Sequence, residues 1–236
     1  MNEILICREL TKSYSGGAAA IDHINLNLNS GCVIGLLGPN GSGKTTLIKM
    51  IAGILTPTSG SLLVDGMPVG PQTKAIVSYL PDQTYLNPAM TVSQVLDYFG
   101  DFYRDFDRNR ADTMLAQLSV NPYVKLKTMS KGTREKVQLI LVMSRHARLY
   151  LLDEPIAGVD PAARDYILHT IVNHYDPGAT VILSTHLIAD VEPVLNEAVF
   201  LQQGRISLYD SVDNIRQREG KSVDALFREV YRCWGN

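Results

Sequence analysis

The sequence has few cysteines, little net charge and no long apolar segment. Its 236 residues include three cysteines, Cys7, Cys32 and Cys233. Their odd number and wide spacing argue against a disulfide framework or a metal cluster and favour a reducing compartment. A formal net charge of −2 gives no reason to expect nucleic-acid binding. No apolar run approaches the about 20 residues of a membrane-spanning helix, and the start of the chain does not resemble a signal peptide. If the protein works at a membrane, we expect another chain to cross it.

The composition is that of an ordinary globular protein. Hydrophobic residues make up 45% of the chain and charged residues 19%, as in folded domains with a buried core. The sequence shows no low-complexity segment, long linker or internal repeat. Its length allows one large domain or two small ones.

A glycine-rich segment at residues 38–45 fits the pattern G-x-x-x-x-G-K-[S/T]. It lies between an apolar run at residues 32–37 and a helical pattern at residues 46–52, the context that a phosphate-binding loop needs. Glycines let backbone N–H groups surround phosphate oxygens, and the helix N-terminus adds partial positive charge. In such a loop Lys44 reaches the β- and γ-phosphates, and the Thr45 hydroxyl holds Mg²⁺. The residues expected to contact the nucleotide here are Gly38, Pro39, Asn40, Gly41, Ser42, Gly43, Lys44, Thr45 and Thr46.

The first ninety residues combine antiparallel strand patterns with buried strands. Residues 3–30 alternate short apolar runs with polar residues, and a turn at residues 15–17 separates two expected strands. A second strand pair is expected on either side of Asp65-Gly66. The apolar run at residues 75–80 predicts a buried strand that ends at Pro81.

The rest of the chain alternates helical and strand patterns. A helical pattern over residues 91–118 begins at Thr91, a suitable N-cap, and a further helix is expected from about Ser130. The later alternation is typical of a parallel α/β sheet that carries a helical insertion. The later segments are a strand at 150–152, a helix at 161–174, a strand at 180–184 and helices from about 211.

Two acidic residues follow the apolar run at residues 149–152. Carboxylates at the C-terminal end of a strand lie in the crevice where α/β sheets bind ligands. Asp153 is placed to bind Mg²⁺, and Glu154 to polarise the water that attacks the γ-phosphate. An apolar run that ends in Asp-Glu is a weak signal alone. Together with the phosphate-binding loop it indicates ATP hydrolysis.

These motifs, in this order, resemble the ATP-binding subunit of an ABC transporter, from Leu10 to about Arg205. The resemblance implies an α/β fold: a P-loop NTPase core with a mostly parallel sheet, an N-terminal antiparallel β subdomain and a helical insertion that carries the signature motif. It also implies ATP and Mg²⁺ as cofactors. The other matching positions are Tyr14 for adenine stacking, Ser130 and Gly132 of the signature, Asp160 in the loop after the second acid, and His186 for the γ-phosphate.

Two of these matches have structural alternatives. Stacking of Tyr14 on the base would contribute about 1–3 kcal/mol, but a half-buried strand tyrosine would give the same pattern. A lone histidine is more often structural than functional. His186 directly follows a strand pattern and lies in motif order, which favours a functional role.

The sequence departs from the family's pattern in two motifs. In the signature, Lys131 replaces a glycine and Thr133 a glutamine. Lys131 either adds positive charge near a phosphate or points to solvent. Asp82 stands where a glutamine is usual, and Gln83 follows one residue later. The spacing to Thr91 assigns the substitution to Asp82. We therefore expect the Asp82 carboxylate to contact Mg²⁺. The changes resemble those of ABC-2-type exporters, whose cassettes and membrane subunits are separate chains.

The resemblance implies one ATP-binding domain over residues 1–236. The expected parts are a core with its β subdomain at about 1–90 and 146–210, a helical subdomain at 91–145, and C-terminal helices at 211–236.

We expect an ATPase subunit that powers a transporter, with export as the expected direction. Two cassettes, identical or related, would face head to tail, with each ATP between the phosphate loop of one and the signature of the other. ATP binding would close this dimer and hydrolysis would open it. A separate polytopic membrane subunit is the second expected partner, and no nucleic acid is expected. The chain would then act peripherally at the cytoplasmic face of the cell membrane.

Other function classes fit less well. A DNA-repair ATPase of this type needs a long coiled coil between Thr45 and Ser130, where no long heptad run occurs, and the translation type carries two cassettes in one chain. An ABC-type ATPase for cofactor-cluster assembly stays open as the alternative. A nucleotide-binding regulator without hydrolysis is disfavoured by Glu154 and His186. The sequence does not identify the cargo.

A groove between the core and the helical insertion is the expected docking site for the membrane subunit. The Asp82 loop and the start of the Thr91 helix should line it. Residues 85–90, which include Tyr85, Leu86 and Met90, are suited to receiving a short helix. A loop that only covers the core would have the same composition.

Overall fold

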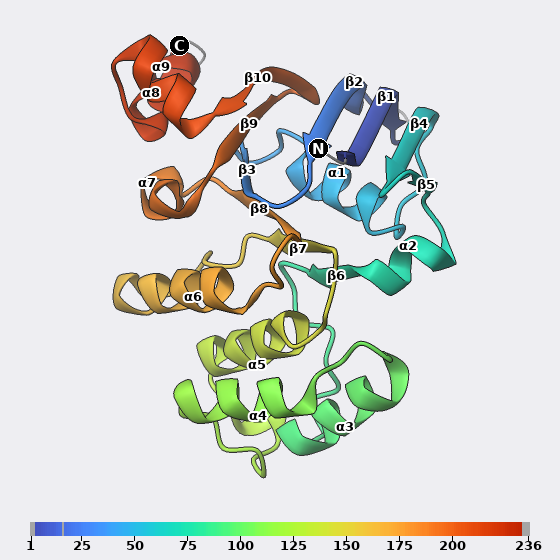
Figure 1. Cartoon of the computed structure of the whole chain (residues 1–236), viewed down its shortest axis with the longest axis vertical. Helices are drawn as coiled ribbons and strands as arrows, with labels where there is room; N and C mark the ends of the chain where they lie inside the picture. The colour runs from blue at the N-terminus through green and yellow to red at the C-terminus, as the bar shows by residue number, and fades with distance from the viewer. Residues whose placement is uncertain (1–2, 16, 233–236) are drawn as a thin grey trace.

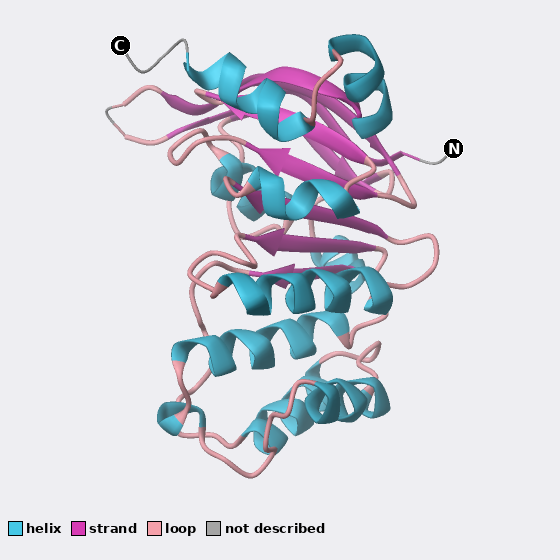
Figure 2. Ribbon diagram, turned by 90° about the vertical axis from the view of Figure 1, so that its left-hand side faces the viewer, coloured by secondary structure: helices cyan, strands magenta, loops and turns pink. Residues whose placement is uncertain are grey.

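Two β-sheets and the helices around them form the described part of the chain, residues 3–15 and 17–232 of a computed structural model (Figure 1). Gly16 of the expected turn and Cys233 lie outside the described residues. The strands gather in one half of the molecule, and a group of helices forms the other end (Figure 2). This arrangement confirms the predicted α/β class. No helix among these residues is long and apolar enough to cross a membrane.

The larger sheet has six strands in the order β10-β9-β3-β8-β7-β6. Its neighbouring strands are parallel except for the antiparallel pair β9 and β10. The central strands are buried along their whole length, which explains why they read as continuous apolar runs. The strands are β3 (Val33–Leu37), β6 (Val77–Leu80), β7 (Leu149–Asp153), β8 (Thr180–Thr185), β9 (Glu197–Gln202) and β10 (Arg205–Ser211).

The smaller sheet is antiparallel and has the strand order β2-β1-β4-β5. Helix α1 packs between this sheet and one face of the larger sheet, where Leu47 and Ile48 join a core cluster with Ile21 and Ile182. The antiparallel subdomain was therefore predicted correctly. The elements are β1 (Glu3–Ser13), β2 (Ala19–Asn29), α1 (Lys44–Ile51), β4 (Ser59–Val64) and β5 (Met67–Pro68).

The helical subdomain contains two helices where the sequence pattern predicted one over residues 91–118. Thr91 caps the first as predicted, since its side chain accepts a hydrogen bond from the Gln94 N–H. The chain then leaves the helix at Tyr103, and Asp107 caps a second helix by accepting from the Arg110 N–H. The helices here are α3 (Val92–Phe102), α4 (Arg108–Gln117) and α5 (Lys131–Met143), preceded by the short helix η1 (Leu126–Thr128).

Two further elements differ from the sequence-based expectation. The strand expected at residues 75–80 begins only at Val77, because residues 71–76 form a helix with Pro71 in its first turn. The hairpin of β9 and β10 was not predicted, although β9 lies beside β3. The other helices are α2 (Pro71–Ile76), α6 (Pro161–His174), α7 (Ile188–Val191), η2 (Glu192–Val194), α8 (Val212–Glu219) and α9 (Val223–Arg232).

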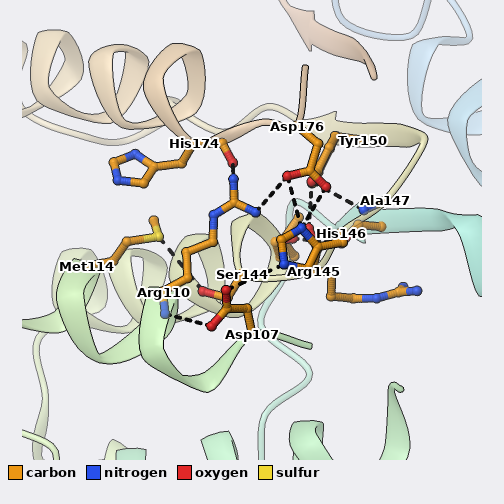
Figure 3. Close-up of polar contacts among 12 residues, drawn as sticks. Asp107, Arg110, Met114, Ser144, Arg145, His146, Ala147, Tyr150, His174 and Asp176 are labelled. Carbon is orange, nitrogen blue, oxygen red and sulfur yellow. Dashed lines mark hydrogen bonds and ion pairs between the residues drawn. The ribbon is translucent and has the colours of Figure 1, made fainter. Parts of the chain in front are cut away.

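A polar cluster joins the helical subdomain to the core (Figure 3). Arg110 of α4 forms an ion pair of 3.1 Å with Asp176, which follows α6, and His146 Nδ1 lies 2.9 Å from the same carboxylate. Tyr150 of β7 donates a hydrogen bond of 2.6 Å to the Arg145 carbonyl. The cluster therefore links α4 and the segment that follows α5 to β7 and to the segment that follows α6.

Candidate nucleotide-binding site

The glycine-rich loop joins β3 to α1 at the carboxyl edge of the larger sheet. Gly43 precedes α1 with φ of 109°, a conformation that side chains rarely adopt, and a Cβ added there would lie 2.4 Å from the Ala20 carbonyl oxygen. Both the backbone and the available space therefore require glycine at this position. This tight turn lets α1 begin at Lys44 with its N-terminus toward the loop.

Lys44 lies inside the loop and is only 5% exposed. Its ammonium donates hydrogen bonds to the Gly38 carbonyl at 2.8 Å and the Pro39 carbonyl at 3.2 Å. The same Nζ lies 3.5 Å from Glu154 Oε1. The fold thus places one cation between the loop and the second acid.

Asp153 at the end of β7 is 1% exposed and is held from two sides. Thr45 Oγ1 donates to its Oδ1 at 3.1 Å, and Ser184 Oγ donates to the same oxygen at 2.6 Å. Burial raises the pKa of the Asp153 carboxyl although these hydrogen bonds lower it, and the charges of Asp82 and Glu154 raise it further. The buried Oδ2 has no hydrogen-bond partner among the described residues.

These oxygens suit a small divalent cation. Mg²⁺ binds oxygen ligands and in phosphate sites uses one or two protein groups with the substrate's phosphates. The site offers Mg²⁺ such oxygen ligands in the Thr45 hydroxyl and the Asp153 carboxylate. The Asp153 Oδ2 atom, which has no hydrogen-bond partner among the described residues, is available to the ion. Asp82 is exposed, and its charge influences the pKa of Asp153, so it lies within electrostatic reach of the same place.

Glu154 turns its carboxylate back toward the loop because its backbone is left-handed, with φ of 51°. Such a conformation costs a non-glycine residue about 1–3 kcal/mol and is typical of functional sites. The Glu154 N–H donates to Ser184 Oγ at 3.1 Å, which holds the turn. His186 Nδ1 lies 3.1 Å from both Glu154 carboxylate oxygens. The structure thus brings Lys44, Glu154 and His186 together.

Tyr14 follows β1 and is 51% exposed, in contrast to the half-buried strand tyrosine that was the structural alternative. Its hydroxyl lies 3.5 Å from Thr46 Oγ1 at the start of α1. The Lys12 ammonium lies 5.6 Å from the centre of the ring. An aromatic ring is therefore available to a base beside the phosphate-binding loop.

The signature segment lies at the start of α5. Ser130 caps this helix by accepting from the Thr133 N–H at 3.2 Å, and its Oγ lies 2.8 Å from Thr133 Oγ1. Gly132 is exposed, and a Cβ there would meet no atom within 4 Å. Among the described residues, no hydrogen bond or ion pair joins this segment to the phosphate-binding loop of the same chain.

Lys131 lies largely in solvent, and its ammonium also approaches two neighbouring groups. Its side chain is 75% exposed, but Nζ lies 3.7 Å from Glu135 Oε1. A Cβ added at Gly158 would lie 3.2 Å from the same nitrogen, so Lys131 reaches over the loop that leads to Asp160. Asp160 itself is exposed just before α6.

Ser184 is a site residue that the sequence reasoning missed. It connects both acids, since its hydroxyl donates to Asp153 and its oxygen accepts from the Glu154 N–H. The available signal was its place two residues before His186 at the end of a strand pattern. Only β-sheet pairing, which aligns Ser184 with Asp153, reveals the contact.

Comparisons with known proteins agree with this geometry. The family model described as ABC transporter matches residues 21–157. The Nod factor export ATP-binding protein I of Cupriavidus metallidurans is 30% identical over 213 residues, which cover 87% of this chain and 70% of that protein. The SkfA peptide export ATP-binding protein SkfE of Bacillus subtilis is 26% identical, over 86% of this chain and 87% of its own.

Solved structures give the same result. The structure of an ATP-binding subunit of an ABC transporter superposes with a TM-score of 0.85 and 26% identity, over 96% of this chain and 99% of that chain. The cbiO1 protein of Clostridium perfringens, part of the transporter complex cbiONQ, gives a TM-score of 0.76 and 26% identity. The match covers 98% of this chain and 95% of that chain. The chain therefore belongs to the ABC transporter family, as an ATP-binding subunit of the kind that hydrolyses ATP to power transport.

Proposed function

We propose that this chain powers an exporter by ATP-driven closure of a cassette dimer and reopening on hydrolysis. The observation that carries the proposal is the position of Glu154, 3.5 Å from Lys44 Nζ and 3.1 Å from His186 Nδ1. The relatives named for export of Nod factor and of a peptide support export as the direction. Cofactor-cluster assembly is the alternative role for the same ATPase site.

The phosphate-binding loop and Tyr14 would hold ATP. Lys44 neutralises the β- and γ-phosphates, while the backbone N–H groups of residues 39–46 surround them. Thr45, Asp153 and Asp82 would hold Mg²⁺, which supplies neutralisation of phosphate charge. The Tyr14 ring would stack on the adenine. The unpartnered Asp153 Oδ2 supports the assignment of Asp153 as a Mg²⁺ ligand.

Hydrolysis would use the pair beside the loop. Glu154 accepts a proton from the water that attacks the γ-phosphorus, as the bond to the leaving oxygen breaks. His186 would donate a hydrogen bond to the γ-phosphate from the ring side that does not face Glu154. The left-handed backbone of Glu154 supports this role, since it aims the carboxylate into the site.

A second cassette would complete the site. Ser130 and Gly132 of the partner would contact the γ-phosphate, with Asp160 at the dimer interface. Exposure of all three residues supports this assembly. We propose the whole chain, residues 1–236, as one ATP-binding domain, with residues 91–145 as the moving helical part.

A membrane subunit would dock in a groove of about 1100 Å³ between the core and the helical subdomain. Tyr85 lines this groove, as the sequence predicted. The end of α3 at Phe102 lines the groove in place of the predicted start of that helix. Leu86 packs against the core, which agrees with the alternative for this segment. Docking there would hold the chain peripherally at the cytoplasmic face of the membrane.

Glu154→Gln tests the proposal most directly. The variant should bind ATP with unchanged affinity and lose hydrolysis by about 10²–10⁴-fold, the contribution of general-base catalysis. It should also accumulate as an ATP-dependent dimer in size-exclusion chromatography, since closure no longer leads to hydrolysis. Hydrolysis at the parental rate would remove Glu154 from this role.

A further inference from the structure

The groove between the core and the helical subdomain has an apolar, aromatic floor. Tyr79, Tyr85, Phe102 and Tyr103 line it, together with smaller apolar residues that follow α1 or belong to α2 and β6. Tyr85 is 52% exposed and Phe102 is 65% exposed. Aromatic surface of this kind is typical of sites that receive a side chain from a partner.

The charged groups around this floor that lack an ion-pair partner among the described residues have one sign. Lys49, Lys74 and Arg104 line the groove, and none of the three has an ion-pair partner among the residues that the structure describes. They come from α1, α2 and the segment after α3, so three separate parts of the chain contribute them. The groove therefore carries an excess of positive charge that the fold itself does not neutralise.

The remaining charges of the groove neutralise each other. Arg145 is 3% exposed and forms a two-point ion pair with Asp105, at 3.0 Å from Nε and 2.9 Å from Nη2. Arg145 also donates to the Val77 carbonyl and lies over the Tyr103 ring at 3.9 Å. This pair is part of the wall, and Asp105 cannot also balance the three free cations.

The size of the groove limits its occupant. A helix about 10 Å across would fill 1100 Å³ with roughly two to three turns. Such a helix has room for one apolar face on the aromatic floor and one polar edge beside the cations. Charge complementarity then requires carboxylates on that edge.

We propose that the groove selects an amphipathic helix of a partner protein that carries acidic residues along its polar edge. The inference rests on the proposed docking function and adds the chemistry by which the partner is recognised. The floor contributes affinity through apolar burial. Lys49, Lys74 and Arg104 determine specificity, because a helix with a basic edge would meet uncompensated like charge.

The test uses three labelled peptides of roughly 15 residues, with the same Leu, Phe and Ala face and a polar edge of Glu, Gln or Lys. Fluorescence anisotropy measures their binding to the full chain at low and high salt. The Glu-edged peptide should bind about tenfold more tightly than the Lys-edged one at low salt, the sum expected of a few exposed ion pairs. The difference should shrink at high salt.

Lys74→Glu combined with Arg104→Glu should reverse the order of the peptides. The matched control is Lys125→Glu with Lys127→Glu, two exposed lysines that do not line the groove, and it should preserve the order. Thermal melts check that each variant is folded. Equal affinities, no binding of the Glu-edged peptide, or an unchanged order in the groove variant would each overturn the inference.

Two further measurements separate this inference from other outcomes. If the groove variant loses binding to vesicles of phosphatidylcholine with phosphatidylglycerol while the peptides are not discriminated, the cations bind lipid headgroups and the inference is wrong. ATP binding and hydrolysis by the parental chain are measured alongside. Their absence would contradict the proposed function, whereas their presence without peptide selection contradicts only the inference.

Discussion

The two halves of the proposed nucleotide site differ in how complete they are. In the core, Lys44 and Asp153 are 5% and 1% exposed and are held by contacts within the chain. In the helical subdomain, Ser130 is exposed, and within the described part of the chain its hydroxyl forms hydrogen bonds only with Thr133 of the helix that it caps. The phosphate-binding half is therefore built by one chain, while the signature half presents its groups outward.

The difference has a physical cause. Groups that neutralise phosphate must be oriented before the substrate binds, and burial within one fold provides this orientation. The price is desolvation of Asp153, whose pKa is raised by its burial. The signature groups are exposed in the single chain, so in the proposed dimer their contribution would depend on association and would be lost when the dimer opens.

The largest expected effect follows from Lys44→Ala, which removes the cation of the phosphate-binding loop. ATP affinity should fall by about 2–5 kcal/mol, the cost of removing one partner of a buried charge pair, and turnover should be abolished. Titration with a fluorescent ATP analogue and a phosphate-release assay measure both. Unchanged affinity and activity would contradict the site assignment.

Ser130→Ala should separate the two halves. A hydrogen bond to a charged group contributes about 1.5–3 kcal/mol, so turnover should fall about ten- to hundredfold. ATP affinity of the single chain should stay the same, because its own phosphate loop is intact. Ser130→Thr, which retains a capping hydroxyl, is the control, and a loss of monomer affinity would show that the signature acts within its own chain.

Asp82→Ala and Gln83→Ala form a matched pair for the altered loop. If Asp82 takes the place of the usual glutamine, its loss should reduce Mg²⁺-dependent turnover several-fold, while Gln83→Ala has little effect. Gln83 lines the proposed docking groove and Asp82 does not, so we expect the two residues to have different roles. Turnover of both variants is measured at several Mg²⁺ concentrations. A larger loss of turnover in Gln83→Ala than in Asp82→Ala would assign the role of the usual glutamine to Gln83.

Asp153→Asn should give the smallest effect, on stability. Burial raises the pKa of Asp153 in the folded state, so the folded protein favours the protonated carboxyl. The stability that this group contributes is complete below its unfolded-state pKa. It is lost as the pH rises through its folded-state pKa. At neutral pH the buried charge therefore destabilises the protein without nucleotide, and the amide should raise Tm, by about 2–4 °C for each kcal/mol gained. Differential scanning fluorimetry tests this; the gain should vanish at low pH, and a lower Tm at neutral pH would contradict it.

Elements with strong local signals were predicted well. The pattern around Lys44, the N-caps Thr91 and Ser130, and the helix at residues 161–174 depend on neighbouring residues and appear where expected. The break between α3 and α4 was missed because apolar spacing continues through Phe99, Tyr103 and Phe106. These rings form one cluster, with centroids 5.5 and 6.0 Å from Phe99, so tertiary packing explains a pattern that looked like a continuous helix.

The phosphate-binding loop, the acid pair and the α/β class could be predicted from the sequence, because contiguous residues and their spacing encode each of them. The contacts of Ser184 with both acids, and the presence of Lys49, Lys74 and Arg104 along one groove, became known only from the folded chain. These contacts join segments that are far apart in the chain. Sheet pairing and helix packing determine them, and neither has a signature in local spacing.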